Sequence, residues 1–369
     1  MNKKLIWLGI IIILVIAIFG LFRTQPKSTA IRVGVSLPLT GSATYYGESA
    51  KKGIEVAKDF LANKYPNLEI ELFYEDNQFN PKVAVDSYNK LRLNNIDTVI
   101  THNSPSAIAI QPMADKDGVL QMAISASASK YSTLDDLSFR MTAGTDLEVV
   151  PMIEYLATAS NKIAVIYMNN EIGSSVATSI EKGLKEKGDT SVVYFEGYPA
   201  DANDFRTILT KIKSKTPDSI YVAGLASHIA NILKQMNELG LKANVYTFRT
   251  GEDPVLITSA GNLAEGVIFT TNFDSKNDNA EAKQFVKDYY TKFNEDPNSY
   301  SAEAYEALRF IGLAYSNCGK NNDCIKKTLT SVKDYPTVFG NISFNNNGDI
   351  EYGFVMKTVK GGKFVKFEE

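Results

Sequence analysis

Short apolar strands alternate with amphipathic helices along the chain from residue 30 onward. Residues 31–39 alternate as a buried strand, and the next segment repeats its apolar positions with the 3.6-residue period of a helix. The apolar face of that helix consists of Ile54, Ala57, Phe60 and Leu61. The pattern recurs through residues 68–130, and three or four such units in succession predict a parallel sheet with helices on both faces.

The cycle starts again after SFRMTAGTD, residues 138–146. Five further apolar segments, KIAVIYM, SVVYFEG, SIYVAG, NVYTFRT and GVIFTT, follow between helical stretches and predict a second sheet of the same class. The fold class is therefore α/β, with two Rossmann-like lobes. Two such lobes commonly face each other across a cleft in which ligands bind.

The last third of the chain holds long helices and short strands and does not repeat the unit a third time. We expect it to return to both sheets, so that several crossings form a hinge. The predicted lobe 1 comprises residues 31–141 plus about 272–337, and lobe 2 comprises residues 142–271 plus about 338–369.

Residues 5–22, LIWLGIIIILVIAIFGLF, carry no charge and are long enough to cross a bilayer as a helix. Lys3 and Lys4 precede them, which favours a cytoplasmic N-terminus and export of everything that follows. Residues 1–30 are accordingly predicted to be a membrane anchor and tether on the extracytoplasmic face, with a cleaved signal peptide as the alternative.

Composition and cysteine usage exclude several other classes. A net charge of -3 offers no basic surface for nucleic acid. The two cysteines, Cys318 and Cys324, lie in one polar loop of an exported chain and predict a local disulfide. The two histidines, His102 and His228, are far from these thiols, so no metal site is expected.

No catalytic motif stands out in the sequence. GxxxxGK[ST], GxGxxG, GxSxG and HExxH are all missing, and Ser227 beside His228 is explained better by helix capping than by a catalytic triad. We expect neither enzymatic activity nor a cofactor.

A candidate ligand site lies in residues 97–130. Ser104 followed by Pro105 predicts a helix start, where free NH groups and the helix dipole favour an anion such as a carboxylate. The next strand leads to Ser125, Ser127 and Ser129 at the same sheet edge. These residues alone are equally compatible with ordinary caps and turns.

Several segments, taken in order, resemble one known family. They are IRVGVSLPLTGSATYYGESAKKGIEVAKDF, YEDNQFNPKVAVDSYNKL, SFRMTAGTD, NDFRTILTKIKSKTPDSIYVAG, GNLAEGV, YSAEAYEAL and VFGNISFNNNGDI, and together they span residues 31–369. The chain is similar to solute-binding proteins of the leucine/isoleucine/valine-binding type, which are type I periplasmic binding proteins of ABC importers.

The resemblance implies a ligand clamped between the lobes, with its carboxylate held in lobe 1. By position, Ser104 matches the serine at the helix start, Ser125 and Ser127 match the pair after the next strand, and Tyr46 matches an aromatic of the first loop. This coincides with the anion site inferred from capping.

The match is weaker in lobe 2. Ile172 stands where the family usually has an aromatic, and Leu225, directly after SIYVAG, is a further candidate contact. The family's acidic partner for a ligand ammonium aligns with Arg249 or, with a loop shift, with Glu252. Because a buried ammonium needs a counter-charge, Glu252 in the cleft would indicate an amino acid, whereas Arg249 would favour a second carboxylate or a neutral polar ligand. Our interpretation favours Glu252.

The sequence thus predicts an extracytoplasmic binding protein of an ABC importer that takes an amino acid, branched-chain or related, and presents it to a membrane permease. A ligand-sensing ectodomain, an exported enzyme, or a binder of an amide or carboxylate instead of an amino acid are the alternatives.

Overall fold

The computed structural model of this chain describes residues 30–131, 136–188 and 190–368. The predicted membrane segment, residues 5–22, lies outside these described residues. None of the helices within the described ranges combines the length and apolar character that a membrane crossing requires.

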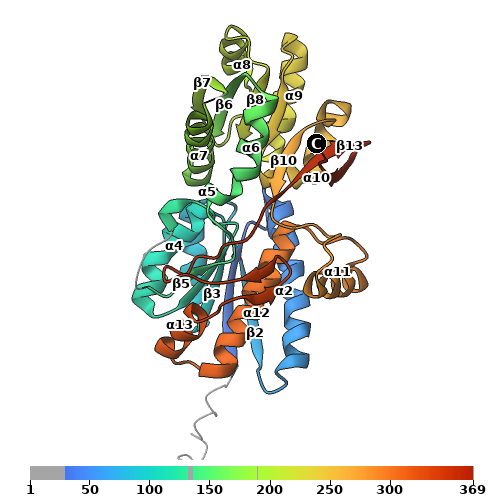
Figure 1. The fold of residues 1–369 in the computed structure, drawn as a ribbon. Coiled ribbons are helices and arrows are strands. Elements are labelled where there is room, and N and C mark those ends of the chain that lie inside the picture. Colours follow the sequence, from blue (N-terminus) through green and yellow to red (C-terminus); the bar gives the residue numbers. More distant parts are fainter. Residues whose placement is uncertain (1–29, 132–135, 189, 369) are drawn as a thin grey trace, which may run out of the picture. The chain divides into compact units, whose positions relative to one another are not determined.

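The first sheet has five parallel strands in the order β2-β1-β3-β4-β5 (Figure 1). Strands β3 and β4 are buried along their whole length, as expected for a parallel sheet covered on both faces. The strands are β1 (Ile31–Leu37), β2 (Ile70–Asp76), β3 (Thr98–His102), β4 (Leu120–Ile124) and β5 (Ser138–Arg140). The connecting helices are α2 (Thr44–Lys64), α3 (Pro81–Arg92) and α4 (Ser104–Asp117), and the short turn η1 (Ser129–Tyr131) follows β4.

The second sheet has the order β14-β13-β10-β9-β8-β6-β7. Its parallel strands are β6 (Lys162–Met168), β7 (Ser191–Tyr198), β8 (Ser219–Ala223), β9 (Asn244–Thr247) and β10 (Ile268–Thr271), and the antiparallel edge pair is β13 (Val355–Lys360) and β14 (Lys363–Lys366). The helical elements are α5 (Thr145–Glu148), α6 (Val150–Ala159), α7 (Glu171–Lys187), α8 (Arg206–Lys213), α9 (Ala226–Leu239), η2 (Arg249–Glu252), α10 (Pro254–Ala260) and η3 (Gly261–Ala264). The predicted α/β class with two parallel sheets is confirmed.

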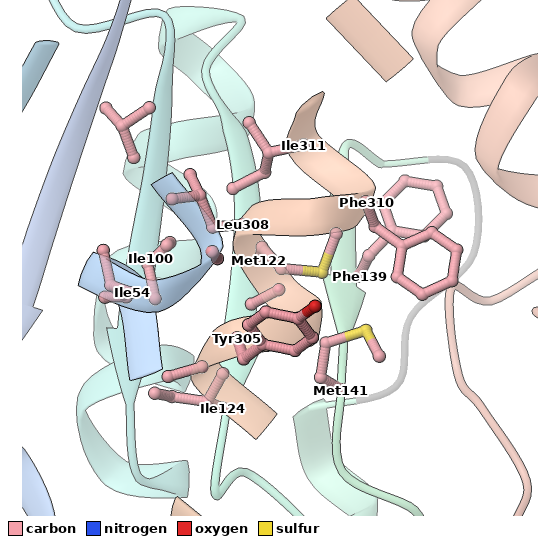
Figure 2. Close-up of a cluster of buried hydrophobic side chains, with 14 of the residues drawn as sticks. Ile54, Ile100, Met122, Ile124, Phe139, Met141, Tyr305, Leu308, Phe310 and Ile311 are labelled. Atoms are coloured by element: carbon pink, nitrogen blue, oxygen red, sulfur yellow. The ribbon is translucent and has the colours of Figure 1, made fainter. Parts of the chain in front are cut away.

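Helices from the last third of the chain complete the core around the first sheet. They are α11 (Ala280–Phe293), α12 (Ser299–Cys318) and α13 (Asn322–Thr330). Figure 2 shows Tyr305, Leu308 and Phe310 of α12 among Met122 and Phe139 of the sheet, all buried. We call this sheet with its helices lobe 1, and the seven-stranded sheet with its helices lobe 2.

The chain passes between the sheets three times, after β5, after β10 and before β13. The small hairpin of β11 (Tyr335–Thr337) and β12 (Gly340–Ile342), together with Phe344 and Ile350, packs on the lobe 1 core. The last crossing therefore follows residue 350, whereas the sequence placed the boundary near residue 338.

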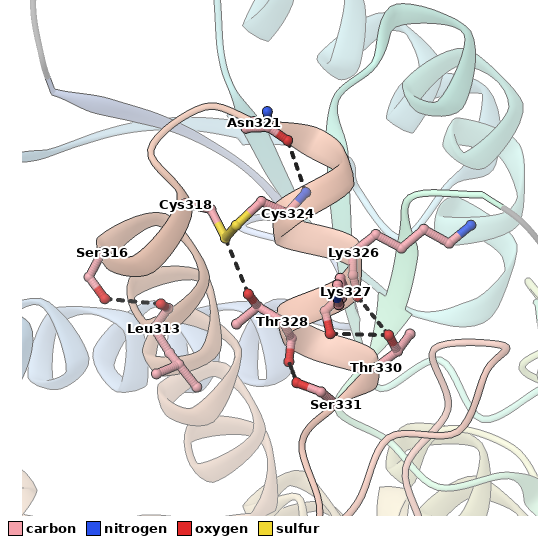
Figure 3. Close-up of a disulfide and its surroundings, with 10 residues drawn as sticks. All are labelled: Leu313, Ser316, Cys318, Asn321, Cys324, Lys326, Lys327, Thr328, Thr330 and Ser331. Atoms are coloured by element: carbon pink, nitrogen blue, oxygen red, sulfur yellow. Dashed lines mark hydrogen bonds between the residues drawn. A yellow bond between two sulfur atoms is a disulfide. The ribbon is translucent and has the colours of Figure 1, made fainter.

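A disulfide joins Cys318 at the end of α12 to Cys324 in the first turn of α13 (Figure 3). Asn321 caps α13 by accepting a hydrogen bond from the Cys324 backbone NH at 2.9 Å. The disulfide closes the polar loop between two helices that both pack on lobe 1.

Helices α2 and α12 approach so closely that one position on α2 must be glycine. A Cβ atom at Gly53 would lie 2.0 Å from the Ser301 carbonyl oxygen.

We predict that Gly53→Ala lowers the free energy of unfolding by about 1–3 kcal/mol, because helices α2 and α12 must separate to admit the methyl group. Gly353→Ala is the control, since nothing lies within 4 Å of its added Cβ. Equal denaturant midpoints for the two variants would contradict this packing.

Candidate functional site

Helix α4 begins one residue earlier than the sequence predicted. Asn103, at φ 67°, is the N-cap, and its side chain accepts a hydrogen bond from the Ser106 NH at 2.9 Å. Its ψ of 151° lies outside the left-handed helical region, in a backbone conformation that is costly for a non-glycine residue. The side-chain hydrogen bond makes Asn103 the cap, which corrects the assignment of Ser104 as the capping residue. Ser104 is instead the first helical residue, and its hydroxyl accepts a hydrogen bond from the Ala128 NH at 3.1 Å.

At the end of β4, where the sequence predicts a site for a ligand carboxylate, lies a carboxylate of the chain itself. The NH and the hydroxyl of Ser125 both donate to Glu303 Oε2, at 2.7 and 3.1 Å. The hydroxyl of Ser127 donates to Glu148 Oε2 at 3.2 Å. Both predicted anion-binding serines therefore already have internal carboxylate partners.

Glu303 lies on α12 and is fully buried. Besides Ser125, its carboxylate accepts hydrogen bonds from Thr142 at 2.9 Å, Asn272 at 2.5 Å and the Tyr352 hydroxyl at 3.4 Å. Those three residues belong to the three segments that cross between the lobes. The Glu303 carboxylate thus connects lobe 1 to all three segments that cross between the lobes.

Arg249, at the start of η2, reaches this cluster from lobe 2. Its guanidinium donates to Glu303 Oε1 and to the Ser127 hydroxyl, each at 2.9 Å, and lies 3.6 Å from Glu148 Oε2. Burial disfavours its charge, but Glu148 and Glu303 outweigh burial and raise the pKa of Arg249 above its ordinary value. The arginine is a buried cation whose charge is matched within the protein.

Glu252 does not reach the cleft, which corrects our interpretation of it as the partner of a ligand ammonium. Its carboxylate pairs with Lys357 on β13 and accepts a hydrogen bond from the Thr271 hydroxyl at 3.0 Å. This lysine, 105 residues away in the sequence, neutralises the acid inside lobe 2.

Both lobes line one cavity of about 30 Å³. Five predicted contacts are among its walls: Tyr46, Ser125, Ile172, Leu225 and Arg249. Ser104, Ser127 and Glu252 are not. The remaining lining residues, which sequence reasoning missed, are Phe79, His102, Asn103, Met168, Phe248, Thr250 and Tyr300.

Aromatic rings form much of the cavity wall. The Tyr46 and Tyr300 ring centroids are 4.7 Å apart, and Tyr46 stacks on His102 at 6.4 Å. Phe79, held at φ 57°, brings its ring 6.4 Å from His102. Burial, with a smaller contribution from the positive Arg249, lowers the pKa of His102 to about 3, so the imidazole is neutral.

An open groove of about 810 Å³ lies next to the cavity. Phe79, Met168 and Leu225 line both spaces. Two acids, Glu171 and Asp201, line the groove, together with the side-chain amides of Gln78, Asn80, Asn169 and Asn170. No group of three metal-ligating side chains occurs within the described parts of the chain.

Residues 30–363 match the profile of a family described as periplasmic binding protein. The chain belongs to this family. Periplasmic binding proteins of this type are solute-binding components of ABC transporters, located outside the cytoplasm, and are not enzymes.

The chain is similar to proteins of known structure or curated name. It is 28% identical to Leu/Ile/Val-binding protein homolog 2 of Brucella abortus, covering 94% of this chain and 93% of that protein. LivJ of Streptococcus pneumoniae, solved with isoleucine, has a TM-score of 0.82 at 24% identity, covering 91% and 97%. A solute-binding protein of Rhodopseudomonas palustris, solved with 3,4-dihydroxybenzoic acid, has a TM-score of 0.82 at 20% identity, covering 92% and 97%. The structural likenesses establish the two-lobe fold.

The charge cluster of this binding protein gives a direct test. Arg249→Met leaves Glu303 and Glu148 buried without their cation, so we predict a loss of about 3–5 kcal/mol in the free energy of unfolding, measured by denaturant titration. The effect of Arg249→Met should be smaller in a Glu303→Gln background, because one of the two carboxylates that lose their cation is then already neutral.

Arg206→Met is the matched control for the buried arginine. Arg206 pairs with Glu238 on the surface, where both side chains are about half exposed and solvent screens the pair, so its removal should change the free energy of unfolding little. Similar losses for the two arginine variants would show that Arg249 is not a buried, matched charge.

Proposed function

We propose that this chain is the extracytoplasmic substrate-binding protein of an ABC importer, closing on a small organic solute between its lobes and presenting it to the membrane permease. The observation that carries the proposal is the cavity shared by both lobes. Lobe 1 contributes Asn103 and Ser125, and lobe 2 contributes Leu225 and Arg249, each just after a sheet strand. Ligands of open α/β folds bind at such strand ends.

The solute is of amino-acid size with an apolar or flat body. Tyr46, Phe79, Phe248 and Tyr300 offer ring faces and edges to such a body. The structural neighbours solved with isoleucine and with a dihydroxybenzoic acid hold ligands of this size. An amino acid, an amide and an aromatic acid all belong to this range.

Entry of such a solute requires the lobes to separate. Residues of both lobes wall the cavity, so a solute that occupies it enters while the lobes stand apart. The three crossing segments supply the hinge, and the contacts of Arg249 with Ser127 and Glu303 join the lobes when they are closed.

Thermal unfolding in the presence of amino acids, amides, aromatic acids and sugars tests this function. A solute at a hundred times its dissociation constant should add ~2.7 kcal/mol of stability, which raises the melting temperature by several degrees. Leu225→Trp should abolish the shift by filling the cavity. Leu93→Trp, at an exposed position, should retain it.

Two results would contradict the proposal: a panel that leaves the melting temperature unchanged, or a shift that survives in Leu225→Trp. The first would show that no solute of this range is bound. The second would show binding outside the cavity between the lobes.

We further propose that residues 5–22 tether the protein to the membrane. The uncharged apolar run after Lys3 and Lys4 supports retention of the segment. The intact mass of protein recovered from washed membranes should include this segment, whereas a signal peptide would be missing from a released, shorter chain.

A further inference from the structure

Most polar groups that face the cavity are already hydrogen-bonded within the protein. Ser125 donates to Glu303. Thr250 donates to the Gly224 carbonyl at 2.6 Å, and Tyr300 donates to the Arg249 carbonyl at 3.2 Å. None of these hydroxyl hydrogens is left for a ligand.

The cavity also offers no unmatched charge. Arg249 is the one ionised side chain among the described residues that line it, and its guanidinium bonds Glu303 and Ser127 and lies beside Glu148. A ligand carboxylate would meet a cation that already has its carboxylate. No carboxylate among the described residues lines the cavity to pair with a ligand ammonium.

Two neighbouring side chains at the end of β3 do retain free hydrogen-bonding groups. Within the described residues, neither ring nitrogen of His102 has a partner, and the same holds for the Asn103 amide nitrogen. Both residues line the cavity and are at most 2% exposed. His102 is a neutral imidazole, because burial lowers its pKa to about 3.

The hydrogen-bonding groups of Asn103 and His102 determine which donors and acceptors a ligand must present. The Asn103 amide nitrogen can only donate, whereas a neutral imidazole donates through one nitrogen and accepts through the other. A primary amide carries a carbonyl that accepts and an NH₂ that donates, so it can satisfy both side chains without bringing a charge into the cavity. Burying a charged group there without a partner would be far more costly.

We propose that the cavity selects an uncharged solute, a small primary amide whose head bonds Asn103 and His102 and whose apolar body packs against Tyr46 and Tyr300. This inference rests on the proposed function and narrows its solute class. Glu303 is the determinant of the selection, because it fills the site at Ser125 with the protein's own carboxylate.

Matched pairs of ligands isolate charge from shape. We would titrate the purified protein with benzamide against benzoate and isovaleramide against isovalerate, with leucine as the zwitterion, by calorimetry and thermal unfolding at neutral pH. The dissociation constant of each amide should be at least about 100-fold lower than that of its acid.

Two variants locate the selection. Asn103→Asp keeps the capping oxygen and the shape but turns the free donor into an acceptor, so amide affinity should fall at least about tenfold. The buried carboxylate should also lower the melting temperature of the free protein. Glu303→Gln uncovers the Arg249 charge, so benzoate affinity should rise relative to benzamide.

The outcomes separate the two claims. If acids or leucine bind the unmodified protein as tightly as the amides, the selection of uncharged solutes is wrong while the importer function stands. If Asn103→Asp binds amides unchanged, the assigned contact is wrong. If no member of the panel binds, the proposed function fails and the inference fails with it.

Discussion

The buried carboxylate of Glu303 holds the two halves of this protein in one arrangement. It accepts hydrogen bonds from Ser125 in lobe 1, from Thr142, Asn272 and Tyr352 in the three crossing segments, and from Arg249 in lobe 2. Desolvating such an ion is costly, and the arrangement is tolerable only because its oxygens are fully engaged. The donors include one residue of each crossing segment as well as Ser125 and Arg249, which line the ligand cavity. A movement of the hinge therefore changes the hydrogen bonds at the cavity wall.

The periodicity of apolar residues predicted both sheets because each strand and helix unit is a local pattern. Ser125 and Leu225 could likewise be placed near the cavity, since the carboxyl ends of parallel strands meet at one sheet edge, whereas Tyr46 was placed by its match to the family's first loop. What the sequence could not reveal was the partner of each polar group. Glu303 lies 178 residues from Ser125, on a helix face whose spacing marks it only as core.

The same limitation explains the error at Glu252. Nothing near TFRTGEDP indicates that Lys357, on the last strands, neutralises it. His102 and Asn103 were missed for a different reason, although they border the predicted helix start. Asn103, at a positive φ, caps the helix one residue before the predicted cap, and its amide nitrogen has no partner among the described residues. Phe79 is placed similarly, by a hydrogen bond from its NH to Asn77 Oδ1 at 2.9 Å.

The late arrival of helix α12 has a consequence for how the protein is made. Strands β6 to β10 of lobe 2 form a continuous stretch that can pair soon after synthesis, whereas the lobe 1 sheet lacks Tyr305 and Phe310 until more than 300 residues have emerged. During that interval, apolar side chains such as Ile54 and Met122 have no helix to cover them. Residues 31–141 are therefore the part of the nascent chain that exposes apolar surface longest, until the C-terminal third reaches them.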